Sequence, residues 1–133
     1  MKADVFVNLC VADVLKSRKF FENLGFEVKE EYSDDTGYCL SINERTYAMM
    51  LGLEKYMLFS KNTVVDSFKH TELIFSLDVG SVDAVNQILD KVKKLGGTEI
   101  GSAHDDDYMY YRSFRDLDGH HFEIFSMKKN INT

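Results

Sequence analysis

The order of hydrophobic patterns along this chain occurs twice. A strand-like alternation over residues 5–11 is followed by a helical spacing over 14–24 and then by three strand-like stretches. The same order returns with an alternation over 72–77, a helical stripe over 82–95 and three more strand-like stretches. Neither half could bury a face of its sheet alone. The repeat therefore predicts an α+β fold of two βαβββ modules.

Local signals mark the ends of these elements. Asp13 and Ser81 precede the two helices, where a side-chain oxygen can accept a hydrogen bond from a free backbone N–H group. Gly25 and Gly96 stand where the helices should end. The other strands are expected at residues 26–32, 37–43, 46–51, 98–102, 108–114 and 120–126. A short helix near 54–59 and a loop would join module 1, about residues 1–60, to module 2, about 70–128, within a single domain of residues 1–133.

Composition and charge disfavour several kinds of partner and location. The formal net charge of −6 disfavours nucleic acids and anionic membrane surfaces. No apolar run approaches the length of a membrane span, and the first residues alternate instead of forming the apolar block of a signal peptide. Cys10 and Cys39 lack a C-x-x-C spacing. We therefore expect a cytoplasmic protein with two free thiols.

Alternation along the strands separates a helix-facing side from a second side that could form a site. The side chains expected against the helices are Val7, Leu9, Val11, Leu73, Phe75 and Leu77. A sheet that curls with its helices outside would leave the second side lining a cup. The side chains expected in this cup are Phe6, Asn8, Cys10, Glu72, Ile74, Ser76, His121, Glu123 and Phe125.

Two acids, Glu72 and Glu123, are the chemically distinctive members of this set. Carboxylates that share a cavity can bind a divalent cation or act as an acid–base pair. The alternative is that each acid points to water or meets an arginine such as Arg112. Tyr110 could add an aromatic wall for a planar ligand, or could be an ordinary half-buried strand residue.

The segment 113–127 predicts a strand, a tight turn at 116–119 and a second strand, since Asp and Gly favour such turns. Glu123 falls in the middle of the second strand between aromatic residues. A charge placed there needs a partner, water or a ligand. Before this segment, His104 and the acidic run 105–107 are expected to form a solvated loop.

Four segments together resemble the vicinal oxygen chelate superfamily, which includes glyoxalase I, extradiol dioxygenases and bleomycin-resistance-type proteins. The segments are VNLCVAD at 7–13, SRKFFENLGF at 17–26, the restart at 71–97, and RSFRDLDGHHFE at 112–123. The resemblance implies two βαβββ modules that form a half-open curved mixed sheet with helices on the outside. It also implies a homodimer, because dimerisation usually completes or supports the cup in this superfamily.

Enzymes of this superfamily hold a divalent metal through four His or Glu side chains, one from each of four strands. The resemblance places these positions at Phe6, at Met50 or Leu51, at Glu72 and at Glu123. Apolar side chains at two positions cannot coordinate a cation. His121 could supply a substitute ligand from the strand that carries Glu123.

The resemblance therefore implies a protein that binds a small organic molecule in its cup, with an incomplete or absent metal site. The expected ligand contacts are Phe6, Glu72, Tyr110, Arg112, His121 and Phe125, with Glu123 as the catalytic residue of any reaction. The alternative is a metal-dependent lyase or dioxygenase that holds Zn, Ni, Fe or Mn through Glu72, Glu123 and His121. A third option is an interaction domain whose cup is filled by its own side chains.

Overall fold

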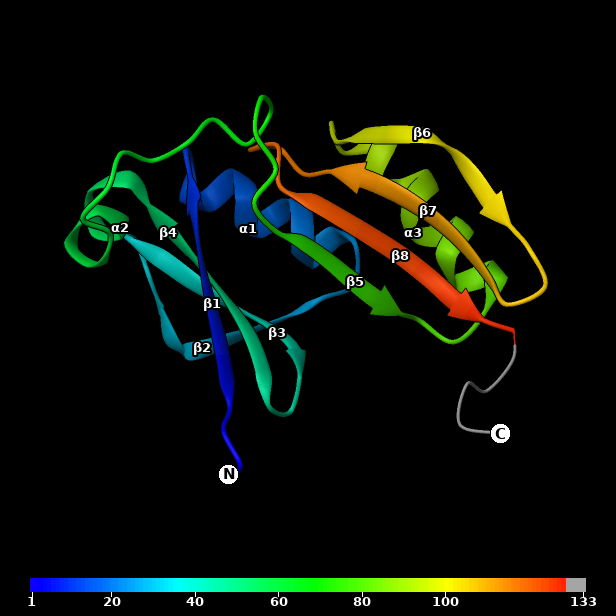
Figure 1. Cartoon of the computed structure of the whole chain (residues 1–133). Helices are drawn as coiled ribbons and strands as arrows, with labels where there is room; N and C mark the ends of the chain where they lie inside the picture. Colours follow the sequence, from blue (N-terminus) through cyan, green and yellow to red (C-terminus); the bar gives the residue numbers. More distant parts are fainter. Residues whose placement is uncertain (129–133) are drawn as a thin grey trace. The chain divides into compact units, whose positions relative to one another are not determined.

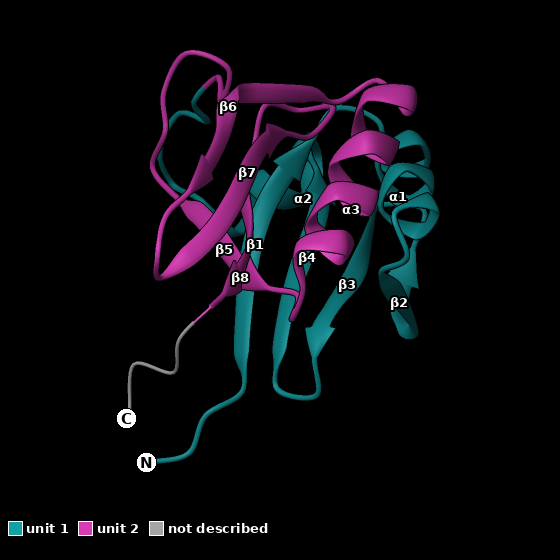
Figure 2. Cartoon of the chain, turned by 90° about the vertical axis from the view of Figure 1, so that its right-hand side faces the viewer, with its two compact units in different colours: residues 1–65 teal, residues 66–133 magenta. Residues whose placement is uncertain are grey.

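The computed structural model describes residues 1–128 and divides the chain into two compact units, Met1–Val65 and Asp66–Thr133 (Figure 2). The division falls between the two modules predicted from the sequence. Each unit has its own sheet and its own helix packed against that sheet. No helix within residues 1–128 has both the length and the apolar character needed to cross a membrane.

The first unit contains a four-stranded mixed sheet, here sheet A (Figure 1). Its elements are β1 (Val5–Val11), α1 (Val14–Asn23), β2 (Glu27–Asp34), β3 (Gly37–Asn43), β4 (Thr46–Gly52) and α2 (Leu53–Phe59). The strand order is β1-β4-β3-β2, in which β1 runs parallel to β4 and the other neighbours are antiparallel. This is the predicted βαβββ module.

The second unit repeats this arrangement in sheet B. Its elements are β5 (Ile74–Asp78), α3 (Val82–Lys94), β6 (Thr98–Asp105), β7 (Met109–Arg115) and β8 (His121–Met127). The order β5-β8-β7-β6 has the same parallel and antiparallel neighbours as sheet A. The α+β class and the two βαβββ modules are therefore confirmed.

Helices α1 and α3 begin at the residues that the sequence indicated. The Asp13 side chain accepts a hydrogen bond from the N–H group of Lys16, and the Ser81 side chain accepts one from Ala84. Past the helices, Gly25 and Gly96 have φ values of +102° and +96°. A residue in this left-handed region lets the last turn of a helix close on its own carbonyls.

Most of the buried core of each unit lies on the helix-facing side of its sheet. In the first unit, Phe20 and Phe21 of α1 are buried, and the Oγ of Ser17 lies 2.7 Å from the hydroxyl of Tyr38 on β3. In the second, α3 packs across β7 and β8 (Figure 1). Phe114 and Phe122 stack there with 5.1 Å between ring centroids. We call the opposite side of each sheet its distal face.

Two expectations about strand ends were wrong. Leu73, expected against a helix, precedes β5 and is 40% exposed. β6 runs on to Asp105, so His104 lies in a strand and not in a loop. Gly101 within β6 has a φ of +65° and accompanies an irregularity in the pairing between Ile100 and His104. A bulge of this kind re-aims a strand without ending it.

Candidate functional site

The distal face of sheet B brings together three of the predicted site residues. His121, Glu123 and Phe125 alternate along β8 with Phe122 and Ile124, which are fully buried on the helix-facing side. His121, Glu123 and Phe125, which are half-buried, therefore share the distal face. Their neighbours across the sheet are Ile74, Ser76 and Asp78 on β5, and Arg115, Ser113 and Tyr111 on β7.

Glu123 is a half-buried acid with small polar neighbours. The Ser76 hydroxyl donates a hydrogen bond to its Oε1 over 3.5 Å, which is a long contact. Beside it, burial lowers the pKa of His121; the positive charge of Arg115 adds to this effect and Glu123 opposes it. A neutral imidazole has one nitrogen lone pair for a hydrogen bond or a metal. The pair could thus accept hydrogen bonds from a ligand.

Glu72 lies at an exposed bend before β5. The register of β5 and β8 pairs Ser76 with Glu123, so Ser76 occupies the place beside Glu123. Strand pairing does not bring the two acids together. A role for Glu72 in ligand or metal binding stays a prediction.

Tyr110 and Arg112 lie on the helix-facing side of sheet B, away from Glu123. The Tyr110 hydroxyl and the Arg112 Nη1 both donate hydrogen bonds to Asn86 Oδ1 on α3, over 2.7 and 2.9 Å. Arg112 also donates two hydrogen bonds of 2.8 Å to the carboxylate of Glu99. Tyr110 and Arg112 therefore do not share a face with His121, Glu123 and Phe125, and their role in ligand binding stays a prediction.

This ion pair changes the pKa values of both partners. Hydrogen bonding to Arg112, with a further contribution from Lys93, lowers the pKa of Glu99 to about 2. Hydrogen bonding to Glu99 raises the pKa of Arg112 above its ordinary value. Arg112 thus holds β6, β7 and α3 together.

The distal face of sheet A carries Phe6, whose ring stacks on Tyr47 with 4.8 Å between centroids. The pairing of β1 with β4 aligns Phe6, Asn8 and Cys10 with Tyr47, Met49 and Leu51. Met50 is fully buried on the opposite side. Neither a histidine nor a carboxylate stands beside Phe6 in these two strands. This part of the first module does not fit a cation held in the manner of the superfamily's enzymes.

Asp116, Asp118 and His120 offer possible metal-ligand atoms within 4.8 Å of one another in the β7–β8 turn. This segment was expected only to form a turn, although its D-x-D-x-H spacing is visible in the sequence. Asp116 Oδ1 accepts hydrogen bonds from the N–H groups of Asp118 and His120, and Oδ2 lies 2.8 Å from His120 Nδ1. These bonds explain the burial of Asp116 without a cation.

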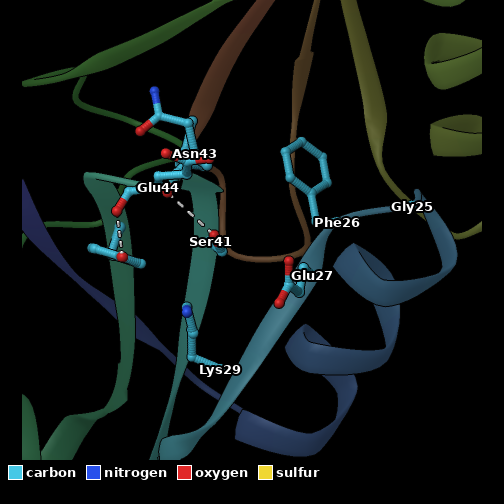
Figure 3. Close-up of a pocket in the computed structure, with 9 residues that line it drawn as sticks. Gly25, Phe26, Glu27, Lys29, Ser41, Asn43 and Glu44 are labelled. Atoms are coloured by element: carbon cyan, nitrogen blue, oxygen red, sulfur yellow. Dashed lines mark hydrogen bonds between the residues drawn. The ribbon is translucent and has the colours of Figure 1, made fainter.

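A pocket of about 430 Å³ opens in the first unit, at the end of sheet A where β2 begins and β3 turns into β4 (Figure 3). Strand pairing sets Glu27 opposite Ser41 and Lys29 opposite Cys39, while Ser41 also pairs with Tyr47. Glu27, Lys29, Ser41 and Tyr47 therefore share the distal face. The lining residues are Gly25, Phe26, Glu27, Lys29, Ser41, Ile42, Asn43, Glu44 and Tyr47.

None of the residues of this pocket was among the site residues predicted from the sequence. The alternation of β2 shows that Glu27 and Lys29 share a face, which is a local signal. Their grouping with Ser41 and Tyr47 depends on the register of three strands, which the sequence pattern alone does not set.

Comparison with known proteins gives a family. The family model described as Glyoxalase/Bleomycin resistance protein/Dioxygenase superfamily matches residues 5–124. No functionally curated protein matches the chain.

Several solved structures share the fold. The hypothetical protein SA1046 from S. aureus is 27% identical, with 95% of each chain covered and a TM-score of 0.81. A glyoxalase/bleomycin resistance protein/dioxygenase family enzyme from Burkholderia phytofirmans PsJN is 20% identical over 91% of this chain and 95% of its own, with a TM-score of 0.75. A glyoxalase-related enzyme from Fulvimarina pelagi is 16% identical over 95% and 88%, with a TM-score of 0.78.

Proposed function

Because the chain belongs to the glyoxalase/bleomycin resistance protein/dioxygenase superfamily, we propose that it binds a small organic molecule on the distal face of sheet A, without a metal of the superfamily type. The observation that carries the proposal is the pocket on sheet A. Its volume of about 430 Å³ lies within the common range for small-molecule sites, about 300–1,000 Å³. An interaction domain with a filled cup would have no such hollow.

The absence of a metal in this proposal follows from the lining. The pocket residues include no histidine or cysteine, and Phe6 stands where the resemblance expects a ligand. Borderline cations such as Zn²⁺ are held mainly by imidazole and thiolate. The lining instead offers an ammonium, carboxylates, a hydroxyl and two aromatic rings, which suit an organic ligand.

A ligand-observed NMR screen of small aromatic and aliphatic molecules tests this function. We expect some molecules to bind the unaltered protein. Their binding should be lost in the Ser41→Tyr variant, because the larger side chain would fill the pocket. The matched control is Ser102→Tyr, at an exposed serine of β6 outside the pocket. A screen without hits, or hits that Ser41→Tyr leaves unchanged, would contradict binding in this pocket.

A metal-dependent lyase or dioxygenase is the second candidate. The observation that favours it is the shared distal face of His121 and Glu123, whose side chains are of types that bind metals. Metal analysis after dialysis against Zn, Ni, Fe or Mn separates the candidates. One equivalent of metal in the protein, lost with His121→Ala and with Glu123→Gln, would favour this enzyme over the metal-free binder.

We also propose that the protein is a cytoplasmic homodimer. The acidic composition and the two cysteine thiols, which form no disulfide within residues 1–128, suit a reducing compartment. Self-association would remove exposed apolar side chains of α2 from water, since none of its residues is buried.

A further inference from the structure

We propose that the pocket of sheet A takes a small zwitterion with an aromatic or other apolar group, such as an amino acid of that kind. This inference rests on the proposed function and assigns the chemical class of its ligand. Charges of both signs and two aromatic rings line the same hollow, and each can be traced to a particular residue.

Lys29 is the cation of the pocket. Its side chain is 32% exposed and extends toward the level of Ser41 (Figure 3). Its ion pair with Glu31 spans 3.9 Å, and the Glu31 side chain is 61% exposed. A pair so long and so exposed contributes little. The ammonium therefore keeps donors available for a carboxylate in the pocket.

Glu27 is the matching anion. It lies two residues before Lys29 on the same face of β2, so the two backbone positions are about 7 Å apart. Among the ion pairs of residues 1–128, none joins Glu27 to Lys29. The two charges are thus held on one face without neutralising each other. A ligand with an ammonium and a carboxylate a few ångströms apart could meet both.

The lining carries charges of both signs, with an excess of negative charge. Glu44 adds a second carboxylate, so one cation and two anions line the pocket. A simple anion would meet this excess of negative charge. A simple cation would meet the ammonium of Lys29.

Phe26 and Tyr47 supply the apolar wall. The Tyr47 ring is held on one side by its stack on Phe6, and its hydroxyl donates a hydrogen bond of 2.7 Å to the Glu44 carbonyl. Phe26 is half-buried and makes an edge contact with Phe21 of α1, with centroids 5.8 Å apart. Rings fixed in this way bind an apolar group without losing much conformational entropy.

Four probes of similar size separate the contributions. L-phenylalanine carries both charges, 3-phenylpropionate the carboxylate alone, 2-phenylethylamine the ammonium alone, and 2-phenylethanol neither. Titrations of the ¹⁵N-labelled full chain, followed by NMR, should show saturable shifts of the Lys29, Ser41 and Tyr47 amides. We expect L-phenylalanine to bind about fivefold or more tightly than each of the other three.

Two variants assign the charges. Lys29→Met should weaken the binding of L-phenylalanine and of 3-phenylpropionate about fivefold. It should change the affinity for 2-phenylethylamine less than about twofold. Glu27→Gln should weaken the binding of L-phenylalanine and of 2-phenylethylamine and leave the affinity for 3-phenylpropionate unchanged. Both side chains lie at the surface, and amide dispersion in the same spectra checks that each variant is folded.

The outcomes separate this inference from the proposed function. Equal binding of 2-phenylethanol and L-phenylalanine at the pocket amides would overturn the zwitterion and leave small-molecule binding intact. Tighter binding of either singly charged probe would also overturn it. If none of the four probes binds saturably up to roughly 20 mM, the inference is overturned. The ligand-observed NMR screen would then still test the proposed function separately.

Discussion

Gly119 closes the turn between β7 and β8 and lies against the backbone before β5. Its φ is +90°, as the turn composition of residues 116–119 suggested. A Cβ built on Gly119 would lie 2.7 Å from the Phe68 nitrogen and 2.9 Å from the Ser67 carbonyl carbon. Arg115 joins the same two segments, because its Nη1 donates hydrogen bonds to the carbonyls of Ser67 and Gly119. A side chain at Gly119 would therefore push backbone against backbone.

We expect Gly119→Ala to lower the free energy of unfolding by about 2–4 kcal/mol, from both the strained φ and the clash. Gly80→Ala is the matched control, since Gly80 also has a φ of +90° but has nothing within 4 Å of its Cβ position. Gly80→Ala should lower the free energy of unfolding by about 1 kcal/mol, because only the strained φ contributes and no clash is added. Urea titration measures both values. Equal costs would show that the segment at Phe68 yields to the new methyl group.

Among the elements, β6, β7 and α3 are joined by the network around Arg112. The pKa of Glu99 falls from 4.5 to about 2 because of its hydrogen bonds with Arg112 and with Lys93. A carboxyl whose pKa is lower in the folded state stabilises that state fully above its unfolded pKa, here about 4.5. This contribution is lost as the pH falls toward about 2.

Glu99→Gln should therefore lower the free energy of unfolding by about 1–3 kcal/mol at pH 7. The loss should shrink by about half or more at pH 3, where the unfolded chain already carries the proton. The control Glu72→Gln, at an exposed bend, should change stability by less than about 0.5 kcal/mol at either pH. An effect of Glu99→Gln that is the same at pH 7 and pH 3 would contradict the network as described.

At the scale of the whole molecule, we expect the protein to self-associate through α2. Leu58 is 70% exposed and Phe59 66% exposed, although both are large and apolar. A second copy would remove this area from water. Light scattering on a sizing column should therefore give twice the chain mass of 15.3 kDa.

Phe59→Lys should shift the protein toward the single-chain mass, because a charge would be carried into the interface. Leu15→Lys changes a 59% exposed side chain on α1 and should leave the mass unchanged. A single-chain mass for the unaltered protein, or equal effects of the two variants, would contradict a dimer formed through α2.

Much of the fold could be predicted because its signals are local. The caps Asp13 and Ser81 act on an N–H group three residues away, and hydrophobic spacing reports on neighbours in the same helix or strand. The alternation of β8 likewise placed His121, Glu123 and Phe125 on one face. Each of these features depends on a few successive residues.

The site could be predicted only in part, because its grouping crosses strands. The pairing of Ser113 with Glu123 puts odd-numbered residues of β7 on the distal face, and so puts Tyr110 and Arg112 against α3. A change of one residue in the turn would reverse these faces. The sequence pattern gave no measure of that register.

By itself, the sequence determined the duplicated order of elements, the helix caps and the alternation of faces within each strand. These follow from backbone geometry and hydrophobic period over short stretches. Only the tertiary structure decided that Ser76 stands beside Glu123, that Arg112 pairs with Glu99, and that a hollow forms around Lys29. Strand register and side-chain packing join residues far apart in the chain, and the energy of each such contact depends on all its neighbours at once.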